Sequence, residues 1–386
     1  MGASAHDSSA GDDNYEALTS TVIARPGGSG RPVATDDRVH YLVVVEGTAR
    51  GRRIELGDKG LLIGRAKPAD IVFNDQEISR NHCRVSLVMG ELCVADAGSS
   101  NGTFVAGVRI AAPTIVAPGE RLSVGTHVLE HEFRSRKEVE AAGALDTDLE
   151  KAKQYVRSLL PERIRQGAVQ TDWVLQPCAK LGGDLFGYHF IDPQTFAIYL
   201  IDVTGHGTDA AMHAVSVTNV LRQRNLTGVD ARDPARMAAH LNETFQMETH
   251  GGMLLSLWYG VYDLQAGTLA YTSAGHHAAY LVGPGRIDAL PLETSNVLIG
   301  MMPGYTYRSG YTKVPRGSLL YVFSDGVFEI EMPDGNEWGI GNFVPLLTAP
   351  AEPNTTESRR ILEAVKSTTG YESFEDDFTL VVATLG

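Results

Sequence analysis

The chain has 386 residues, 43% hydrophobic and 21% charged, with a formal net charge of -14 at pH 7. This length fits two domains, each able to build its own core. The acidic balance argues against a nucleic-acid partner. Three scattered cysteines indicate neither a disulfide framework nor a zinc site. No stretch reaches the ~20 apolar residues of a membrane span and no signal peptide is evident, so we expect a cytoplasmic protein with no membrane partner.

Residues 1–37 are rich in Ser, Gly, Asp and Ala and are predicted to form a disordered tail. The next stretch, 38–135, alternates short apolar runs with turn residues and shows no helical period, which predicts a β-sandwich domain. The expected strands are Tyr41–Val45, Leu61–Ile63, Cys83–Val88, Leu92–Ala95 and Val128–Phe133.

Residues 136–161 are predicted to be a linker built on a helix over Thr147–Leu160. Thr147 and Glu150 are placed as a capping box, and Pro161 would end the helix. Apolar residues recur at alternating spacings of three and four: Leu149, Ala152, Val156 and Leu159. This stripe must be covered, and two candidates are open: the following domain, or the same helix of a second subunit in a homodimer.

Residues 162–386 mix strands with two helical stretches, one after Thr208 and one after Asp233-Pro234, where Asp suits the N-cap and Pro the first helical position. Expected strands are Leu254–Tyr262, Thr268–Ser273, Ser318–Phe323 and Phe378–Thr384. The first two are predicted to form a hairpin. Strands following strands, with the helices grouped, predict an α+β domain of layered antiparallel sheets.

Loops of the first domain carry four short motifs: Ile63-Gly-Arg65, Asp70-Ile71, Ser79-Arg-Asn-His82 and Ser99-Ser-Asn-Gly-Thr103. Together they resemble the signature of forkhead-associated (FHA) domains. The resemblance implies that Arg65 and Ser79 hold the phosphate of a phosphothreonine protein, and that Arg80 and Asn101 hold the adjoining peptide. It also implies that His82, with Gly64 and Gly102, shapes the loops. A guanidinium, a hydroxyl and an amide suit this ligand chemically.

A second interpretation concerns the tail segment Leu18-Thr-Ser-Thr-Val-Ile-Ala24. Thr19 or Thr21, once phosphorylated, would fold back onto the FHA domain, and the tether would make that contact hard to displace. An unmodified tail is the simpler alternative.

The second domain places acids at strand ends. Asp202 ends the apolar run Phe196–Val203, and Asp184, Asp325 and the pair Asp376-Asp377 lie at comparable positions. Four such carboxylates brought together would repel one another, whereas hard divalent cations would turn them into an oxygen-ligand cage.

The same domain resembles the PPM (protein phosphatase 2C) family, in the branch of stage II sporulation protein E and the sigma-factor regulators. The motifs, in family order, are Ser158-Leu-Leu-Pro161, Leu181-Gly-Gly-Asp184, Asp202-Val-Thr-Gly-His-Gly207, Thr272-Ser-Ala-Gly-His276, Ser324-Asp-Gly326 and Asp376-Asp-Phe-Thr379. The resemblance implies an αββα sandwich with two Mn²⁺ or Mg²⁺ ions that hydrolyse a phosphoprotein substrate.

By that resemblance, Asp202 bridges the ions, the Val203 carbonyl adds a ligand, and Asp325 and Asp376 complete the second ion, so Asp202, Asp325 and Asp376 are the catalytic acids. Asp184 acts through coordinated water. Spacing alone leaves Asp377 open as the alternative to Asp376.

Two departures qualify this assignment. Phe186-Gly187 stands where the family commonly has a second acid, and no arginine is recognisable as a phosphate clamp. His206 and His276 are interpreted as loop residues rather than acid catalysts.

The preferred interpretation is a metal-dependent serine/threonine phosphatase targeted by its FHA domain. The alternative is a phosphothreonine-binding adaptor with a catalytically silent second domain. A metal-dependent nuclease is disfavoured by the acidic charge.

Overall fold

The computed structural model describes residues 37–386 except 206, 224–227, 333–334 and 372. The expected tail, with Thr19 and Thr21, and His206 therefore lie outside the described residues. The chain divides into two compact units that meet between Gly143 and Ala144. Each unit is described by itself below.

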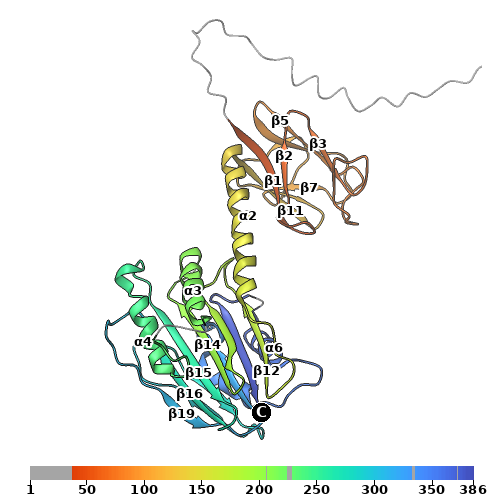
Figure 1. The fold of residues 1–386 in the computed structure, drawn as a ribbon. Helices are drawn as coiled ribbons and strands as arrows, with labels where there is room; N and C mark the ends of the chain where they lie inside the picture. Colours follow the sequence, from red (N-terminus) through yellow and green to blue (C-terminus); the bar gives the residue numbers. More distant parts are fainter. Residues whose placement is uncertain (1–36, 206, 224–227, 333–334, 372) are drawn as a thin grey trace, which may run out of the picture. The chain divides into compact units, whose positions relative to one another are not determined.

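The first unit is built from two packed β-sheets (Figure 1). One sheet has the order β2-β1-β11-β10-β7-β8 and the other the order β4-β3-β5-β6-β9. The strands are β1 (Arg38–Glu46), β2 (Arg53–Leu56), β3 (Leu61–Gly64), β4 (Ile71–Val72), β5 (Cys83–Val88), β6 (Glu91–Asp96), β7 (Thr103–Val105), β8 (Val108–Arg109), β9 (Thr114–Ile115), β10 (Arg121–Val124) and β11 (His127–Ser135).

A single hydrophobic core fills this unit. Leu42 and Leu129 from one sheet pack with Ile63, Val85 and Val94 from the other, and all five side chains are fully buried. The expected sandwich is confirmed, and each of its five predicted strands lies within β1, β3, β5, β6 or β11. The shorter strands escaped prediction because two to four residues carry too little alternation to be recognised.

Helix α2 (Arg136–Leu159) follows β11 without a break. The predicted start at Thr147 is wrong, because the helix already runs through that residue and no capping box forms there. The preceding residues explain the difference: Arg136–Asp146 consist mostly of strong helix formers such as Ala, Glu, Lys and Leu, which outweigh a cap signal inside the run. The predicted end, before Pro161, is confirmed to within one residue.

The second unit holds two five-stranded antiparallel sheets, ordered β13-β14-β15-β16-β19 and β12-β21-β20-β17-β18. The strands are β12 (Val169–Gln176), β13 (Leu185–Asp192), β14 (Thr195–Val203), β15 (Leu255–Asp263), β16 (Thr268–Ala274), β17 (Ala279–Val282), β18 (Ala289–Leu292), β19 (Gly310–Lys313), β20 (Ser318–Phe323) and β21 (Phe378–Leu385). The expected hairpin is β15 with β16, and the two later predicted strands are β20 and β21.

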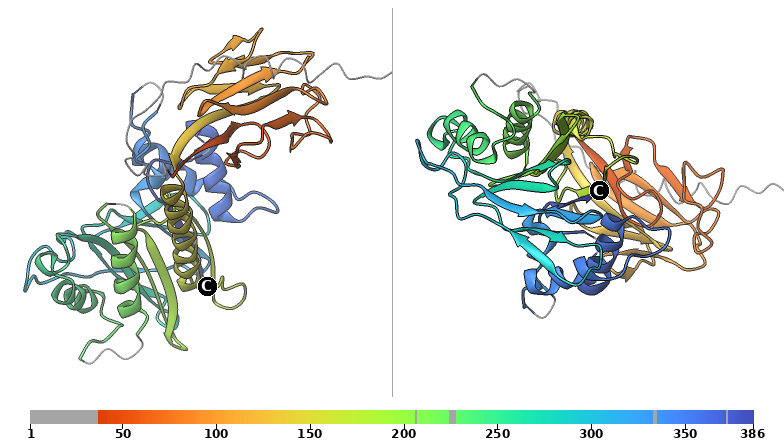
Figure 2. Two further views of the ribbon diagram at one scale, coloured as in Figure 1. Left: turned by 90° about the horizontal axis from the view of Figure 1, so that it is seen from above. Right: turned by 60° about the horizontal axis from the view of Figure 1, so that its bottom comes forward.

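Helices cover the outer faces of both sheets (Figure 2). Those on the first sheet are α3 (Thr208–Leu221) and α4 (Pro234–Thr244), and those on the second are α5 (Gly339–Thr348) and α6 (Glu357–Thr369). Short 3₁₀ turns lie at η1 (Met247–Thr249) and η2 (Asp325–Val327). The arrangement is the expected αββα sandwich. Both predicted helices are confirmed, and the Asp233 carboxylate caps α4 by accepting the Arg236 N–H at 3.2 Å.

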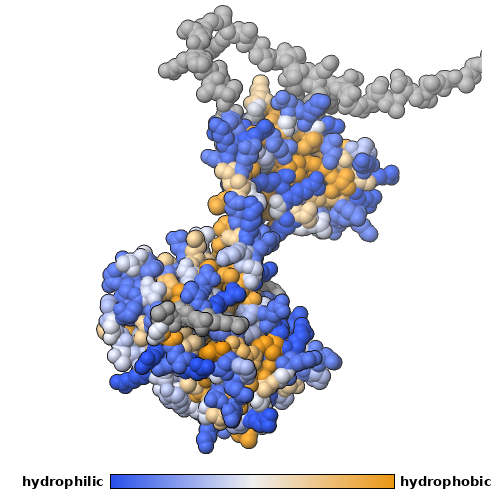
Figure 3. Space-filling view, viewed as in Figure 1, coloured by the Kyte–Doolittle hydropathy of each residue, from blue (hydrophilic) through white to orange (hydrophobic). Residues whose placement is uncertain are grey.

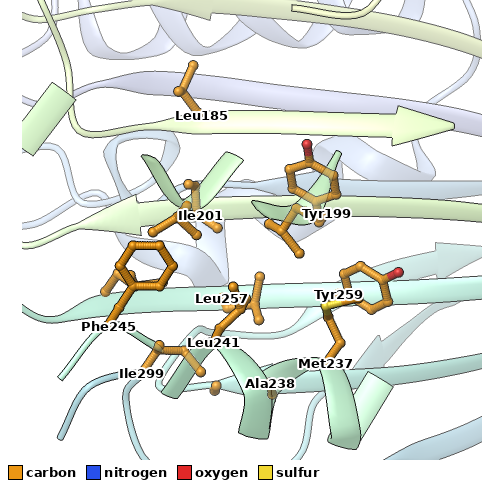
Figure 4. Close-up of a cluster of buried hydrophobic side chains, with 14 of the residues drawn as sticks. Leu185, Tyr199, Ile201, Met237, Ala238, Leu241, Phe245, Leu257, Tyr259 and Ile299 are labelled. Carbon is orange, nitrogen blue, oxygen red and sulfur yellow. The ribbon is translucent and has the colours of Figure 1, made fainter. Parts of the chain in front are cut away.

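Alternation along β14 assigns its side chains to two different cores. Tyr199, Ile201 and Val203 pack under α3 and α4, as Figure 4 shows for Tyr199 and Ile201 beside Leu241. Ile198 and Leu200 pack between the two sheets instead. Because successive side chains of a strand point to opposite faces, Asp202 is directed toward the space between the sheets.

The surface of each unit is mostly hydrophilic, with smaller apolar areas (Figure 3). Exposed apolar side chains include Met89 and Val108 in the first unit and Met212 and Tyr311 in the second. Among the described helices, none is long and apolar enough to cross a membrane.

Candidate functional site

Four chain segments bring carboxylates to one end of the two-sheet core. Asp202 is the penultimate residue of β14, and Asp184 directly precedes β13 beside it. From the second sheet, Asp325 opens the turn η2 after β20, and Asp376 lies just before β21. Strands that are far apart in sequence thus bring their acidic ends close together, as expected from the positions of the motifs.

Electrostatics show how close these groups lie. Burial, together with the charges of Asp325, Asp376 and Asp377, raises the pKa of Asp202 to about 7. Burial also raises the pKa of Asp325, again with Asp376 adding to the effect. These carboxylates therefore resist ionisation together unless a cation joins them.

Asp184 is buried as deeply as Asp377, with 5% of its surface exposed. Its Oδ2 is buried and has no hydrogen-bond partner among the described residues. Burial raises the pKa of Asp184 well above its usual value, and the charges of Asp202 and Asp377 add to this. A buried oxygen without a partner is costly, so this atom fits a ligand or an ordered water.

Asp376 and Asp377 have different surroundings. Asp377 is buried, and its carboxylate accepts N–H groups from Cys178 at 2.9 Å and from Asp184 at 3.3 Å. Its own backbone carbonyl accepts the Ser324 hydroxyl at 2.9 Å. Asp376 is exposed to solvent, and its Oδ1 accepts the Asp377 N–H at 2.7 Å. The buried acid thus ties three segments of the site together, whereas the exposed one is accessible to a ligand.

Two glycines of the Leu181–Asp184 motif permit these close approaches. A Cβ atom on Gly182 would overlap the Asp377 carboxylate, and one on Gly183 would lie 2.8 Å from the Val203 carbonyl oxygen. Only residues without a side chain allow both contacts. The motif therefore holds Asp184 against the end of β14 and places the Val203 carbonyl beside the acids.

The departure at Gly187 does not touch this cluster. Gly187 pairs with Tyr199 in the sheet, and Tyr199 belongs to the core under α3 and α4, whereas Asp202 faces the opposite side. An acid at position 187 would thus point away from Asp202, whereas Phe186 packs between the sheets with Ile198 and Leu200, on the face that Asp202 shares.

Sequence reasoning missed two neighbours of the acids. The Cys178 sulfur and carboxylate oxygens of Asp376 and Asp377 lie within 4.8 Å of one another. Glu329 adds a repulsive charge to Asp202, and its own pKa is raised by burial and by Asp325. Cys178 lies in an irregular segment with no pattern that marks it. Glu329 could have been noticed, because it follows the Ser324-Asp-Gly326 motif closely.

The donor set fits hard divalent cations. Asp202, Asp325 and Asp376 supply carboxylate oxygens, the Val203 carbonyl is adjacent, and the orphaned Asp184 oxygen lies behind them. Oxygen ligands of this kind suit Mg²⁺ or Mn²⁺.

The second candidate site lies on the loops of the first unit. The Arg65 N–H donates to the Ser79 carbonyl at 3.0 Å, and the Ser79 hydroxyl oxygen accepts the Ser100 N–H at 3.0 Å. Asn101 donates its side-chain amide to the Glu77 carbonyl at 2.9 Å. The structure thus brings Arg65, Ser79 and Asn101 onto neighbouring loops, with exposed Arg80 following Ser79.

Buried residues hold these loops in place. His82 accepts the Ser79 N–H at Nδ1, at 3.1 Å, and its Nε2 bonds the Gly102 carbonyl at 3.1 Å. A Cβ atom on Gly64 would overlap the Arg80 carbonyl. Asp96, which the sequence did not single out, accepts the hydroxyl of Thr103 at 2.7 Å. The loop conformation is therefore built into the sandwich rather than left to a ligand.

Comparisons with known proteins agree with this architecture. The family model of Stage II sporulation protein E (SpoIIE) matches residues 192–386, and the FHA domain model matches residues 61–125. Phosphoserine phosphatase RsbU of Bacillus subtilis is 24% identical over 193 residues, covering 50% of this chain and 56% of that protein. FHA domain-containing protein FhaB of Mycobacterium tuberculosis is 37% identical over 90 residues, 23% of this chain and 58% of that protein.

Among solved structures, the SiaA-PP2C domain of Pseudomonas aeruginosa matches with a TM-score of 0.55 and 18% identity, covering 64% of this chain and 99% of that one. At this identity the match concerns the fold. The chain spans about half the length of the curated relatives first matched. It combines a PP2C-like fold with an FHA domain, and it belongs to the SpoIIE family.

Proposed function

We propose that the second unit is a metal-dependent serine/threonine phosphoprotein phosphatase, and that the FHA domain targets it to phosphothreonine-bearing proteins. One observation carries the catalytic part: acids from four segments converge at Asp202, whose pKa is raised to about 7 by burial and by the charges of Asp325, Asp376 and Asp377. The name of the relative RsbU, a phosphoserine phosphatase, supports a phosphoserine or phosphothreonine substrate.

Two Mn²⁺ or Mg²⁺ ions are the proposed cofactors, and Asp202 would be the central residue that holds them. The Val203 carbonyl, Asp325 and Asp376 are the other ligands, and Asp184 acts through water. When bound, such ions activate a water molecule and stabilise the charge that develops on the phosphoryl group. Asp202, Asp325 and Asp376 are accordingly the residues assigned to catalysis.

The protein's own groups prepare this site. Asp184 holds a proton until a cation arrives, because its raised pKa disfavours the charged form. Asp377 fixes the Asp184 and Cys178 segments through their N–H groups. We therefore assign the ligand role to Asp376 and a positioning role to Asp377.

For the FHA domain, Arg65 and Ser79 are the proposed phosphate contacts, and Arg80 and Asn101 the peptide contacts. Their support is the loop geometry, in which the Ser79 oxygen accepts the Ser100 N–H at 3.0 Å, while the Ser79 hydroxyl donates to the Ser100 hydroxyl only at a long 3.4 Å. A guanidinium beside such a hydroxyl suits a doubly charged phosphate. A homodimer through α2 is a further part of the proposal, since no residue of that helix is fully buried.

The direct test is hydrolysis of a generic phosphomonoester by the full chain with added Mn²⁺. We expect metal-dependent turnover in the wild type and loss of most of it in Asp202→Asn. Asp288→Asn, at an exposed position outside the cluster, is the matched control and should remain active. Turnover that survives Asp202→Asn would contradict the metal assignment, and no turnover in any form would favour the adaptor.

A further inference from the structure

A second pocket lies on the other side of the catalytic sheet. Its volume is about 230 Å³, and it is lined by Leu159, Pro161, Gly187, His189, Tyr199 and Arg222. Because Tyr199 and Asp202 are three residues apart on β14, their side chains leave opposite faces of the sheet. The pocket is thus separate from the carboxylate cluster.

Gly187 and Tyr199 form the floor of this pocket. A Cβ atom on Gly187 would overlap the Tyr199 hydroxyl, so only glycine lets the tyrosine ring lie across β13. In Figure 4 the Tyr199 hydroxyl points toward the strand that carries Leu185, which is β13. The acid of the family pattern is absent here, and the Tyr199 side chain occupies the space that a side chain at position 187 would fill.

The Tyr199 side chain is almost completely buried and meets open space at the pocket. The residue is 1% exposed and lines the pocket. Burial raises the pKa of this phenol, so it keeps its proton and can donate it. The hydroxyl is thus a neutral donor available to an acceptor that fills the pocket.

The charge of the pocket is positive. Arg222 lies close enough to Tyr199 to act on its pKa, and its Nη1 donates to the Leu159 carbonyl at 3.3 Å. His189 also lines the pocket, and no Asp or Glu does among the described residues. This is a positive pocket on a chain with a net charge of -14. Its volume is below the ~300 Å³ at which sites for drug-sized ligands begin, which suits a smaller molecule.

We infer that this pocket binds a small oxyanion, a phosphate or carboxylate group, between the Arg222 guanidinium and the Tyr199 hydroxyl. Arginine binds such groups through charge-assisted hydrogen bonds, and a tyrosine hydroxyl adds a neutral donor. The bound anion would bridge the end of α2 at Leu159, the end of α3 at Arg222, and β14. It would thus hold together the elements that flank the catalytic sheet without entering the carboxylate cluster.

The test is a calorimetric titration of the full chain, with chelator present, using inorganic phosphate in one experiment and acetate in another. An Arg65→Ala background removes the FHA phosphate contact. We expect one saturable site for at least one of the two anions, and the anion that binds identifies the source. Arg222→Gln should weaken it about tenfold or more, the loss of one charge-assisted hydrogen bond, and Tyr199→Phe by a smaller factor.

Both variants should fold, since Arg222 is exposed and Tyr199→Phe removes only the hydroxyl. Arg236→Gln, at an exposed position of α4, is the matched control for loss of a positive charge and should bind as the background protein does. Equal dissociation constants in the background protein, Arg222→Gln and Tyr199→Phe would overturn the inference. So would the absence of saturable binding for both anions.

Discussion

At the scale of single residues, the adjacent acids Asp376 and Asp377 have different surroundings and so different expected roles. In chelator, Asp377→Ala should lower the free energy of unfolding by about 1–3 kcal/mol, because the buried N–H groups of Cys178 and Asp184 lose their acceptor. Asp376→Ala should cost less, because it removes the acceptor of only one N–H, that of Asp377, and also relieves repulsion among the acids. Denaturant unfolding of both variants checks this.

Substitutions of Asp376 and Asp377 should also differ in their effect on metal binding. Asp376→Ala should abolish saturable Mn²⁺ binding at the weaker of the two sites, whereas the conservative Asp377→Asn, which keeps an acceptor oxygen, should bind Mn²⁺ nearly as the wild type does. The reverse pattern would make Asp377 the ligand.

The raised pKa of Asp202 predicts a pH dependence. Its folded value of about 7 lies above the ordinary 3.8, so the metal-free protein loses stability as the pH rises between these values and loses no more above 7. Metal binding must displace this proton, so Mn²⁺ affinity should fall up to about tenfold for each pH unit below 7 and level off above it. Calorimetry across pH 5.5 to 8, roughly, would measure this, and a flat profile would contradict it.

The acids of the candidate site could be predicted from the sequence, but the groups that surround them could not. Asp184, Asp202 and Asp325 stand at strand ends beside glycines, which is a local signal. The choice between Asp376 and Asp377 depends on which carboxylate meets the N–H groups of a loop two hundred residues away. The same holds for the proximity of Cys178. Such contacts arise from tertiary packing, and no local pattern encodes them.

At the scale of elements, the FHA loops are held by the sandwich before any ligand binds. Arg65→Ala and Ser79→Ala should each weaken binding of a phosphothreonine peptide, because each removes a donor to a doubly charged group, with charge-assisted bonds worth about 1.5–3 kcal/mol. Fluorescence titration of a labelled peptide measures the change. Arg84→Ala, exposed on β5, removes the same charge as Arg65→Ala and should have little effect. Equal titration curves for wild type and Arg65→Ala would refute the assignment.

Helices and strands were predicted correctly where the spacing of apolar residues agreed with the residues that begin or end an element. The Asp233-Pro234 start of α4 and the buried apolar runs of β15 and β20 are examples. It failed for α5 and α6, which were not identified. Helix α5 contains Pro345 and begins at Gly339, both poor helix signals, whereas Thr356 and Gly370 at the ends of α6 were recognisable caps. The start of α2 was misplaced because a cap signal inside a favourable run does not stop a helix.

At the scale of the whole molecule, the phosphopeptide loops and the carboxylate cluster belong to different compact units. Their chemistry can therefore be removed separately, and Asp202→Asn should leave peptide binding by the FHA domain unchanged. What connects the two in sequence is α2, which contains the boundary between the units. Its end at Leu159 also lines the positive pocket beside β13.

Helix α2 is where a link between binding and catalysis is expected. Val156 packs against the core under α3, so the catalytic unit covers one end of the apolar stripe. Leu149 and Ala152 are only half-buried, and Leu145 is 61% exposed. The stripe is thus incompletely covered, and an isolated helix of this kind is marginal in water. A second copy of the same helix is the proposed cover for the Leu149 end.

We therefore expect Leu149→Asp combined with Val156→Asp to change both the oligomeric state and the catalytic rate, while phosphopeptide binding persists. Because Val156 contacts the core, Leu149→Asp alone is the sharper probe: it should dissociate a dimer without unfolding the catalytic unit. Glu150→Ala, on the exposed side of the helix, is its control. Light scattering and a phosphatase assay measure both quantities. If the double variant matches the wild type in mass and in rate, α2 is only a spacer between two independent units.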